Sequence, residues 1–273
     1  DVPESMKGSA YIRTKRDEIV SLLSYAIGCM FGRYSLGIEG LAFAGGEWDD
    51  SKYDKFKPDA NNIIPITDEA YLEDDIDIIT RICAWLKVVY GEYTLEENLD
   101  FIAKALGNKG NTSREIIRNY FMNDFFKDHC QTYSVTGSGK RPIYWLFDSG
   151  KQNGFKALIY LHRYNADTVG NLRIDYLHRM QRIYESEIGR MQDTIDHRSN
   201  AREVAAATKR KEKLQKQLKE CREYDEKIAH LALSRIELDL DDGVKENYRK
   251  LQTAADGKFH KILADSKNIM SKK

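Results

Sequence analysis

The chain has few prolines and cysteines, four of each among 273 residues, and it has no long hydrophobic run. No segment approaches the roughly 18 successive apolar residues of a membrane-spanning helix, and the amino end lacks the basic-then-apolar pattern of a signal peptide. These absences argue against a membrane protein and predict a cytoplasmic one. The cysteines lie too far apart for a C-x-x-C zinc or redox pair, so buried, reduced thiols are expected at Cys29, Cys83, Cys130 and Cys221.

The formal net charge is zero, because 43 lysines and arginines balance 43 aspartates and glutamates. This balance argues against a chain that coats nucleic acid with its whole surface. The charges are nevertheless unevenly placed, since acidic residues dominate 47–77 and basic ones are frequent after Arg173. The asymmetry predicts a local positive face, although two separate solvated surfaces explain it equally well.

Composition and length indicate a folded protein, with 41% hydrophobic and 32% charged residues. A chain of this size holds one compact body with an appendage. Because the sequence begins at Asp1 and runs straight into dense sequence, we expect a piece of a longer protein.

Residues 1–164 are predicted to form a helical body, because apolar residues recur there at helical spacing. Gly32 ends the first helix, Thr94 and Glu97 form a capping box, and Gly107 ends the helix that follows it. Residues 37–67 are rich in acids and turn formers, which predicts an irregular loop. Helices are predicted over residues 15–31, 72–90 and 94–107 and from residue 113 onward.

A β hairpin is predicted at about 140–162, where two β-rich runs flank a polar connection containing glycine. A hairpin of two strands is only marginally stable alone, so it must complete a sheet or lie on helices. After residue 165 the pattern becomes helical again, and a break near Asn200 predicts a long antiparallel helical hairpin over 165–236 with a coiled-coil-like seam. The rest, 237–273, predicts a turn, a short helix and a basic tail. The fold class is thus mostly α with a small β element, α+β.

Short motifs for common chemistry are incomplete. The segment GSGK at residues 137–140 invites a phosphate-loop interpretation, but Ser134 and Arg141 occupy positions where that motif needs a glycine and a serine or threonine. The six histidines show no metal-ligand spacing such as H-E-x-x-H. We predict no metal site.

Four long blocks resemble a known family, and together they span nearly the whole chain. They are SYAIGCMFGRYSL (24–36), GNKGNTSREIIRNYFMNDFFKDHC (107–130), KRPIYWLFDSGKQNGFKALIYLHRYNADTVGNLRIDYLHRMQRIYESEI (140–188) and YDEKIAHLALSRIELDLDDGVKENY (224–248). Their order and content are similar to the carboxy-terminal region of the PglX family, the adenine-specific DNA methyltransferases of type 1 BREX phage-defence systems.

This resemblance implies a parent protein with a SAM-dependent methyltransferase core that precedes the region seen here. The amino-methyltransferase signature N-P-P-Y cannot occur in this chain, because its prolines stand alone at positions 3, 58, 65 and 142. A glycine-rich turn for a nucleoside cofactor is also missing. The chain alone is therefore predicted to be no enzyme and to bind no cofactor, with SAM held elsewhere in the parent. The implied partners are double-stranded DNA, the methyltransferase core and other BREX proteins, with no membrane.

Nine residues are candidate DNA contacts, because cations near aromatics and glycines suit phosphates and base edges. They are Arg33, Tyr34, Lys140, Arg141, Lys151, Lys156, Arg163, Asn165 and Arg173. Alternatively, Tyr34 packs in the core and Arg33 caps carbonyls at a helix end. The basic cluster at 209–216 is interpreted as a solvated helix surface, since glutamates are interspersed with it.

Two functions remain open from the sequence: a non-catalytic DNA-recognition and scaffold segment, or a protein-interaction module that docks another BREX subunit or the methyltransferase core. A basic surface that continues from the β hairpin onto the first long helix would favour DNA. An exposed apolar stripe along the helical hairpin would favour a protein partner.

Overall fold

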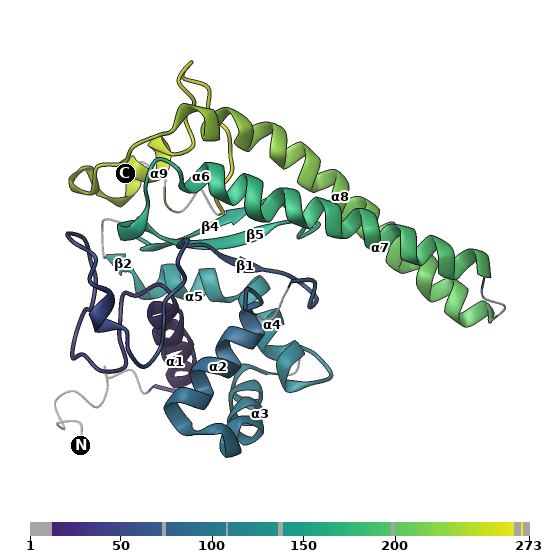
Figure 1. Cartoon of the computed structure of the whole chain (residues 1–273), viewed down its shortest axis with the longest axis horizontal. Helices are drawn as coiled ribbons and strands as arrows, with labels where there is room; N and C mark the ends of the chain where they lie inside the picture. Colours follow the sequence, from purple (N-terminus) through teal and green to yellow (C-terminus); the bar gives the residue numbers. More distant parts are fainter. Residues whose placement is uncertain are drawn as a thin grey trace.

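A small antiparallel sheet lies between two layers of helices in the computed structural model (Figure 1). The structure describes residues 13–72, 75–107, 109–135, 139–197, 200–264 and 269. Helices α1 to α5 lie on one side of the sheet, and the long helices α7 and α8 lie on the other (Figure 1). The predicted α+β class, mostly helical with a small β element, is confirmed.

The first layer follows the predicted helical pattern. Helix α1 (Lys15–Met30) begins at a capping box between Thr14 and Asp17. It ends where Gly32 adopts a φ of 75°, a conformation that glycine takes without the steric cost of a Cβ. The other helices of this layer are α2 (Ile78–Tyr90), α3 (Leu95–Leu106), α4 (Ser113–Asn123) and α5 (Phe125–Thr132).

Helix α2 starts later than the predicted residue 72. The Asp77 carboxylate accepts hydrogen bonds from the backbone N–H groups of Ile79 and Thr80 at 3.0 and 3.2 Å. This side-chain cap satisfies two of the donors that a helix start leaves open. The helix therefore begins at Ile78, and the preceding apolar residues belong to a turn.

The predicted capping box of Thr94 and Glu97 is wrong. A short 3₁₀ turn, η3 (Glu92–Thr94), leads directly into α3, so Thr94 lacks the extended backbone of a usual cap. The Thr94 hydroxyl instead donates backwards to the carbonyls of Tyr90 and Gly91 at 3.0 and 3.2 Å. The expected end of α3 at Gly107 is confirmed, where φ is 113°.

The predicted hairpin gains a third strand from the end of the acidic loop. Strands β4 (Tyr144–Asp148) and β5 (Lys156–Tyr160) pair antiparallel, and β1 (Ile64–Ile66) pairs with β5 to give the order β1-β5-β4. Apart from the partly exposed Asp148 at the end of β4, every residue of these strands is buried, because helices cover both faces of the sheet. A separate ribbon pairs β2 (Ser134–Val135) with β3 (Gly139–Lys140). Residues 136–138, which include part of the GSGK motif, lie outside the described residues.

The segment after α8 returns to the sheet rather than leaving it. The N–H of Asp148 donates to the carbonyl of Ile262 at 3.0 Å, and the N–H of Ala264 donates to the carbonyl of Leu146 at 2.9 Å. The chain thereby covers the free edge of β4, which would otherwise expose unpaired backbone groups. The predicted short helix is α9 (Gly243–Lys250). Residues 265–268 and 270–273, on which most of the predicted basic tail falls, lie outside the described residues.

Two long helices form the second layer. Helix α6 (Thr168–Asn171), a π-helical turn η5 (Leu172–Leu177) and α7 (His178–His197) follow one another without a break. They lie beside α8 (Ala201–Ser234), and the far ends of α7 and α8 project together beyond the body (Figure 1). The coiled-coil-like seam and the division into body, arm and tail remain predictions.

All four cysteines are free thiols, and only Cys83 is partly exposed. No helix among the described residues is both long and apolar enough to cross a membrane.

Candidate nucleic-acid interface

The loop between β4 and β5 is fastened to α8 by one carboxylate, that of Glu220. The Ser149 hydroxyl donates to Glu220 Oε1 at 2.7 Å, and the N–H of Gln152 donates to Glu220 Oε2 at 2.8 Å. The N–H of Gly154 adds a third bond at 3.0 Å. These bonds fix the loop that carries exposed Lys151 against the helix.

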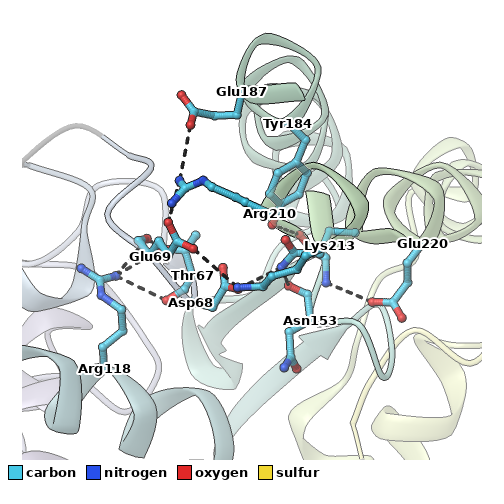
Figure 2. A network of polar contacts seen from close by, with 12 residues as sticks. Thr67, Asp68, Glu69, Arg118, Asn153, Tyr184, Glu187, Arg210, Lys213 and Glu220 are labelled. Carbon is cyan, nitrogen blue, oxygen red and sulfur yellow. Dashed lines mark hydrogen bonds and ion pairs between the residues drawn. The ribbon is translucent and has the colours of Figure 1, made fainter. Parts of the chain in front are cut away.

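A few turns earlier on α8, basic side chains meet the acidic segment that follows β1 (Figure 2). The Arg210 guanidinium lies 2.7 Å from a Glu69 oxygen, and the Lys213 ammonium lies 2.6 Å from Asp68 Oδ2. The Gln217 amide donates to the same Asp68 oxygen at 3.0 Å. Part of the predicted charge asymmetry is therefore neutralised internally, where the acidic segment faces the basic helix.

Within 209–216, which was interpreted as a solvated helix surface, Arg210 and Lys213 remain partly exposed but also pair with the acidic segment. A groove of about 590 Å³ lies along this face of α8. Four of its lining residues are cations and two are anions, and the lining consists of Glu69, Gln152, Ala206, Lys209, Arg210, Glu212, Lys213 and Lys216.

Two lysines that line this groove and one on the adjoining hairpin loop are exposed to solvent. Lys209 and Lys216 line it, and Lys151 adjoins the lining residue Gln152. All three are exposed, and within the part of the chain that the structure describes none of them makes a hydrogen bond or ion pair. We call these three residues the lysine groove. It extends from the hairpin loop onto the second long helix, and not onto the first, where a continuous basic surface would have favoured DNA.

Lys156, predicted to contact DNA, is instead an interior residue. Its side chain is 10% exposed, and its ammonium donates to the Met122 carbonyl at 2.9 Å and lies 3.8 Å from Asp148. A cation with these interior partners is not placed to reach a phosphate, so Lys156 leaves the candidate set.

Arg163 also departs from its predicted role, because it holds the acidic loop onto the body. Its guanidinium donates to the carbonyls of Phe31, Asp59 and Ala60 at 3.2, 2.7 and 3.2 Å. It also lies 4.2 Å from the centre of the Trp48 ring, within the range of a cation–π contact. Its donors are thus directed at backbone carbonyls rather than at solvent.

Arg173 and Asn165 have local partners as well. Arg173 forms a two-pronged ion pair with Asp225 of α8 at 2.7 and 3.1 Å, and His178 Nε2 lies 2.9 Å from the same carboxylate. Partial burial acts to raise the pKa of Asp225, but the bonds to Arg173 and His178 lower it below its ordinary value. Asn165 is exposed, and its side-chain oxygen accepts the N–H of Asp167 at 2.9 Å.

Arg33 and Tyr34 are half-buried between α1 and the sheet. Arg33 donates to the hydroxyls of Tyr160 and Tyr34 at 3.1 and 3.2 Å, so its partners are phenols and not the helix-end carbonyls of the alternative interpretation. Burial acts to lower the pKa of Arg33, and these two hydrogen bonds raise it above its ordinary value. The Tyr34 ring packs over Gly28, where an added Cβ would come within 2.4 Å of the ring. Packing of Tyr34, the alternative interpretation, is what the structure shows.

A cavity of about 190 Å³ lies between α1 and α5, beside Tyr34. Most of its wall is aromatic, and we call it the tyrosine cavity. It is lined by Val20, Ser21, Ser24, Tyr25, Tyr34, Tyr120, Phe125, His129, Thr132 and Tyr133.

The two remaining candidates, Lys140 and Arg141, lie next to this cavity. The N–H of Arg141 donates to the carbonyl of Tyr133 at 2.7 Å, and Lys140 pairs with Ser134 in the ribbon that directly follows Tyr133. Arg141 is exposed and Lys140 is half-buried. The structure therefore brings candidates from residues 33–34 and 140–141 to one place, and Lys151 to another.

His129 forms part of the cavity wall and is buried. Its Nε2 atom accepts the backbone N–H groups of Ile143 and Tyr144 at 3.2 and 3.0 Å. Burial, and secondarily the charge of Arg33, lowers the pKa of His129 to about 3, so the ring is neutral at pH 7.

Sequence reasoning missed the tyrosine cavity and discounted the lysine groove. One signal for the cavity was present, since Phe125, His129 and Tyr133 follow one another at spacings of four and share a helix face. Among the described residues, no group of three or more potential ligands is arranged to hold a metal ion.

No protein-family model matches the chain. The adenine-specific methyltransferase PglX of Lacticaseibacillus casei (strain Zhang) is 46% identical to it over 236 residues, which is 86% of this chain and 19% of that protein. The adenine-specific methyltransferase BrxX of Escherichia coli O9:H4 (strain HS) is 39% identical over 270 residues, which is 94% of this chain and 21% of that protein. The predicted resemblance is confirmed, and the chain spans about a fifth of the length of these curated relatives.

Proposed function

We propose that this chain is a non-catalytic DNA-recognition and scaffold segment of a cytoplasmic, SAM-dependent, adenine-specific DNA methyltransferase that acts in BREX phage defence. Both similar proteins are named adenine-specific methyltransferases, and the chain corresponds to about a fifth of each. The observation that carries the DNA-binding part is the lysine groove, whose Lys151, Lys209 and Lys216 are all exposed on the hairpin loop and the face of α8 beside it.

The non-catalytic part of the proposal rests on the sequence. Adenine methylation needs a pocket for the flipped base and a site for the methyl donor. The four isolated prolines leave no place for the N-P-P-Y signature of such a pocket. SAM would accordingly be bound by another part of the parent protein.

In this proposal the lysine groove contacts the phosphate backbone. Lysine is a flexible point charge that suits a phosphate, and such contacts set position and affinity without reading the base sequence. The Glu220 bonds and the Asp68–Lys213 pair hold the hairpin loop and the acidic segment against α8, so the backbone that carries the three lysines is fixed before binding and only their side chains are ordered by it. Helix α8, with 34 residues, is about 50 Å long and would act as the scaffold.

The test is duplex binding by the whole chain over a salt series, with a variant that carries Lys151→Ala, Lys209→Ala and Lys216→Ala. If each lysine neutralises one phosphate, the dependence of log affinity on log salt falls by about 2.7 in slope, at about 0.9 for each contact. A matched control carries Lys57→Ala, Lys104→Ala and Lys127→Ala, which removes the same charge from exposed lysines elsewhere.

Equal slopes for the two triple variants would contradict the lysine groove as the phosphate surface. Absence of duplex binding by the unmodified chain at low salt would contradict the DNA-recognition function itself.

One observation favours the alternative, a protein-interaction module. Large apolar side chains are exposed around the end of α2, the turn η3 and helix α3, and Tyr93 is fully exposed. Exposed apolar groups of this kind mark sites where another protein surface docks. They lie on the body rather than along the arm, and they are Val88, Val89, Tyr90, Tyr93 and Phe101.

A further inference from the structure

The carboxy-terminal strap, which we define as residues 259–264, covers the free edge of β4, and one glutamine accepts three of its backbone N–H groups. Gln252 Oε1 accepts the N–H groups of Ile262 and Leu263 at 3.1 and 3.0 Å. The Gln252 carbonyl accepts the N–H of His260 at 2.7 Å. His260 therefore shares its anchor with the residues of the strap that pair with β4.

His260 packs inward against a second histidine. It is 8% exposed, and its ring lies against the ring of His230 from α8, with 5.2 Å between the centroids and 28° between the planes. Two neutral imidazoles can stack in this way, whereas two protonated ones repel each other. A histidine in water takes up its proton near pH 6.5, so this contact joins the strap to the helix through groups that change charge just below neutral pH.

Two lysines and one aspartate also act electrostatically on His260. The lysines are Lys258, from the turn before the strap, and Lys227, from α8, and the opposing anion is Asp256 of the same turn. On α8, the exposed Glu226 lies four residues before the second histidine. Burial, followed by the neighbouring positive charges, lowers the pKa of His260 below its ordinary value, so the closed strap favours the neutral ring.

We propose that the stack of His230 on His260 is a pH-sensitive clasp, which holds the carboxy-terminal strap on β4 while the rings are neutral and releases it when they take up protons. His230 is exposed and can gain its proton without leaving water, and a proton on His260 then places a second positive charge 5.2 Å away in a buried position. A released strap returns His260 to water, where the charged ring is solvated. Release also frees the N–H of Asp148 and the carbonyl of Leu146, so the edge of β4 becomes open to pairing with another strand.

Hydrogen exchange of the whole chain at about pH 7.5 and 5.5 tests this clasp, with each amide rate divided by the intrinsic rate at that pH. The probe is the Ala264 N–H, which donates to the Leu146 carbonyl at 2.9 Å when the strap is closed. Uptake of one proton on opening shifts the opening equilibrium toward release as the pH falls, by at most about tenfold for each pH unit, so the protection of Ala264 should fall about three- to tenfold. The Phe31 N–H, which donates to the Ile27 carbonyl in α1, should stay more protected than Ala264, because the strap opens while the body remains folded.

His260→Gln removes the buried titrating ring and should abolish the fall in protection, whereas His197→Gln, at an exposed position at the end of α7, is the matched control and should keep it. His230→Gln changes an exposed residue and should reduce the fall, which provides a second test if His260→Gln does not fold. No fall in the unmodified chain, or an equal fall in His260→Gln, would overturn the clasp. Equal protection of Ala264 and Phe31 would overturn it as well, since the strap would then open only with the whole fold.

Discussion

Cations at two places in this molecule have opposite relations to the fold. Arg163, at the junction of the sheet and the acidic loop, directs its donors at three backbone carbonyls. The lysines of the lysine groove, Lys151, Lys209 and Lys216, are exposed on a regular helix and a fastened loop. Arg163 thus satisfies backbone carbonyls of the fold, whereas the three lysines keep their charges exposed to solvent.

The difference follows from the backbone around each group. An irregular loop such as 37–63 leaves carbonyls without ladder partners, and a guanidinium with five donors can satisfy several of them at once. Helix α8 satisfies its own backbone, so it makes no such demand on its lysines. A cationic residue is therefore a candidate DNA contact only where no neighbouring backbone carbonyl accepts its hydrogen bonds.

Arg163→Ala should have the largest effect on stability of the substitutions compared. Removing the guanidinium leaves the carbonyls of Phe31, Asp59 and Ala60 poorly satisfied, and we expect the free energy of unfolding to fall by about 3 kcal/mol. Urea denaturation followed by circular dichroism measures the loss. Arg202→Ala, at the exposed start of α8, is the matched control and should change stability by less than about 0.5 kcal/mol. Equal effects of the two substitutions would show that Arg163 does not hold the acidic loop onto the body.

His129 represents an intermediate case, a basic group that burial keeps neutral. Its pKa is lowered to about 3 in the folded chain, whereas an unfolded histidine has a pKa of about 6.5. The unfolded state therefore binds the extra proton first, and the stability that depends on neutral His129 is complete above pH 6.5 and is lost as the pH falls toward 3. Relative to His129→Gln, the unmodified chain should lose about 2 kcal/mol between pH 6.5 and 5, measured by urea denaturation at each pH. Parallel pH profiles for the two proteins would mean that His129 does not titrate as described.

Local patterns in the sequence predicted most helices and the hairpin, because periodicity and glycine placement act within a few residues. The helix over 15–31 and the end at Gly107 are confirmed. The partner of β5 was not predicted, since β1 lies about 90 residues away and has only three residues. The capping box at Thr94 was wrong because the preceding 3₁₀ turn gives Thr94 a backbone that is not extended. Its hydroxyl donates to the carbonyls of Tyr90 and Gly91 instead.

The candidate site was less predictable, because spacing along the chain says nothing of burial. Lys151 and Lys156 are five residues apart in one hairpin, yet one is exposed and the other donates to the Met122 carbonyl inside. The acceptors of Arg163 lie more than 100 residues away in sequence. Only the three-dimensional fold separates cations that complete it from cations left to bind something else.

The smallest effect, and the sharpest test of the comparison, is the stability of the triple variant at Lys151, Lys209 and Lys216. Lys213 lies four residues after Lys209 and three before Lys216, and its ion pair with Asp68 at 2.6 Å leaves only part of the like-charge repulsion of about 0.2–0.5 kcal/mol that each pair has at these spacings. Their removal should leave the chain equally stable or stabilise it by a few tenths of a kcal/mol, even as duplex affinity falls.

The gain should appear at low salt and vanish near 1 M, where screening acts within about 3 Å. Urea denaturation at both salt concentrations provides the measurement, with the Lys57, Lys104 and Lys127 variant as control. A loss of more than 1 kcal/mol would place these lysines with Arg163, as parts of the fold. Unchanged or improved stability together with weaker DNA binding is the result expected of a surface that serves a ligand rather than the fold.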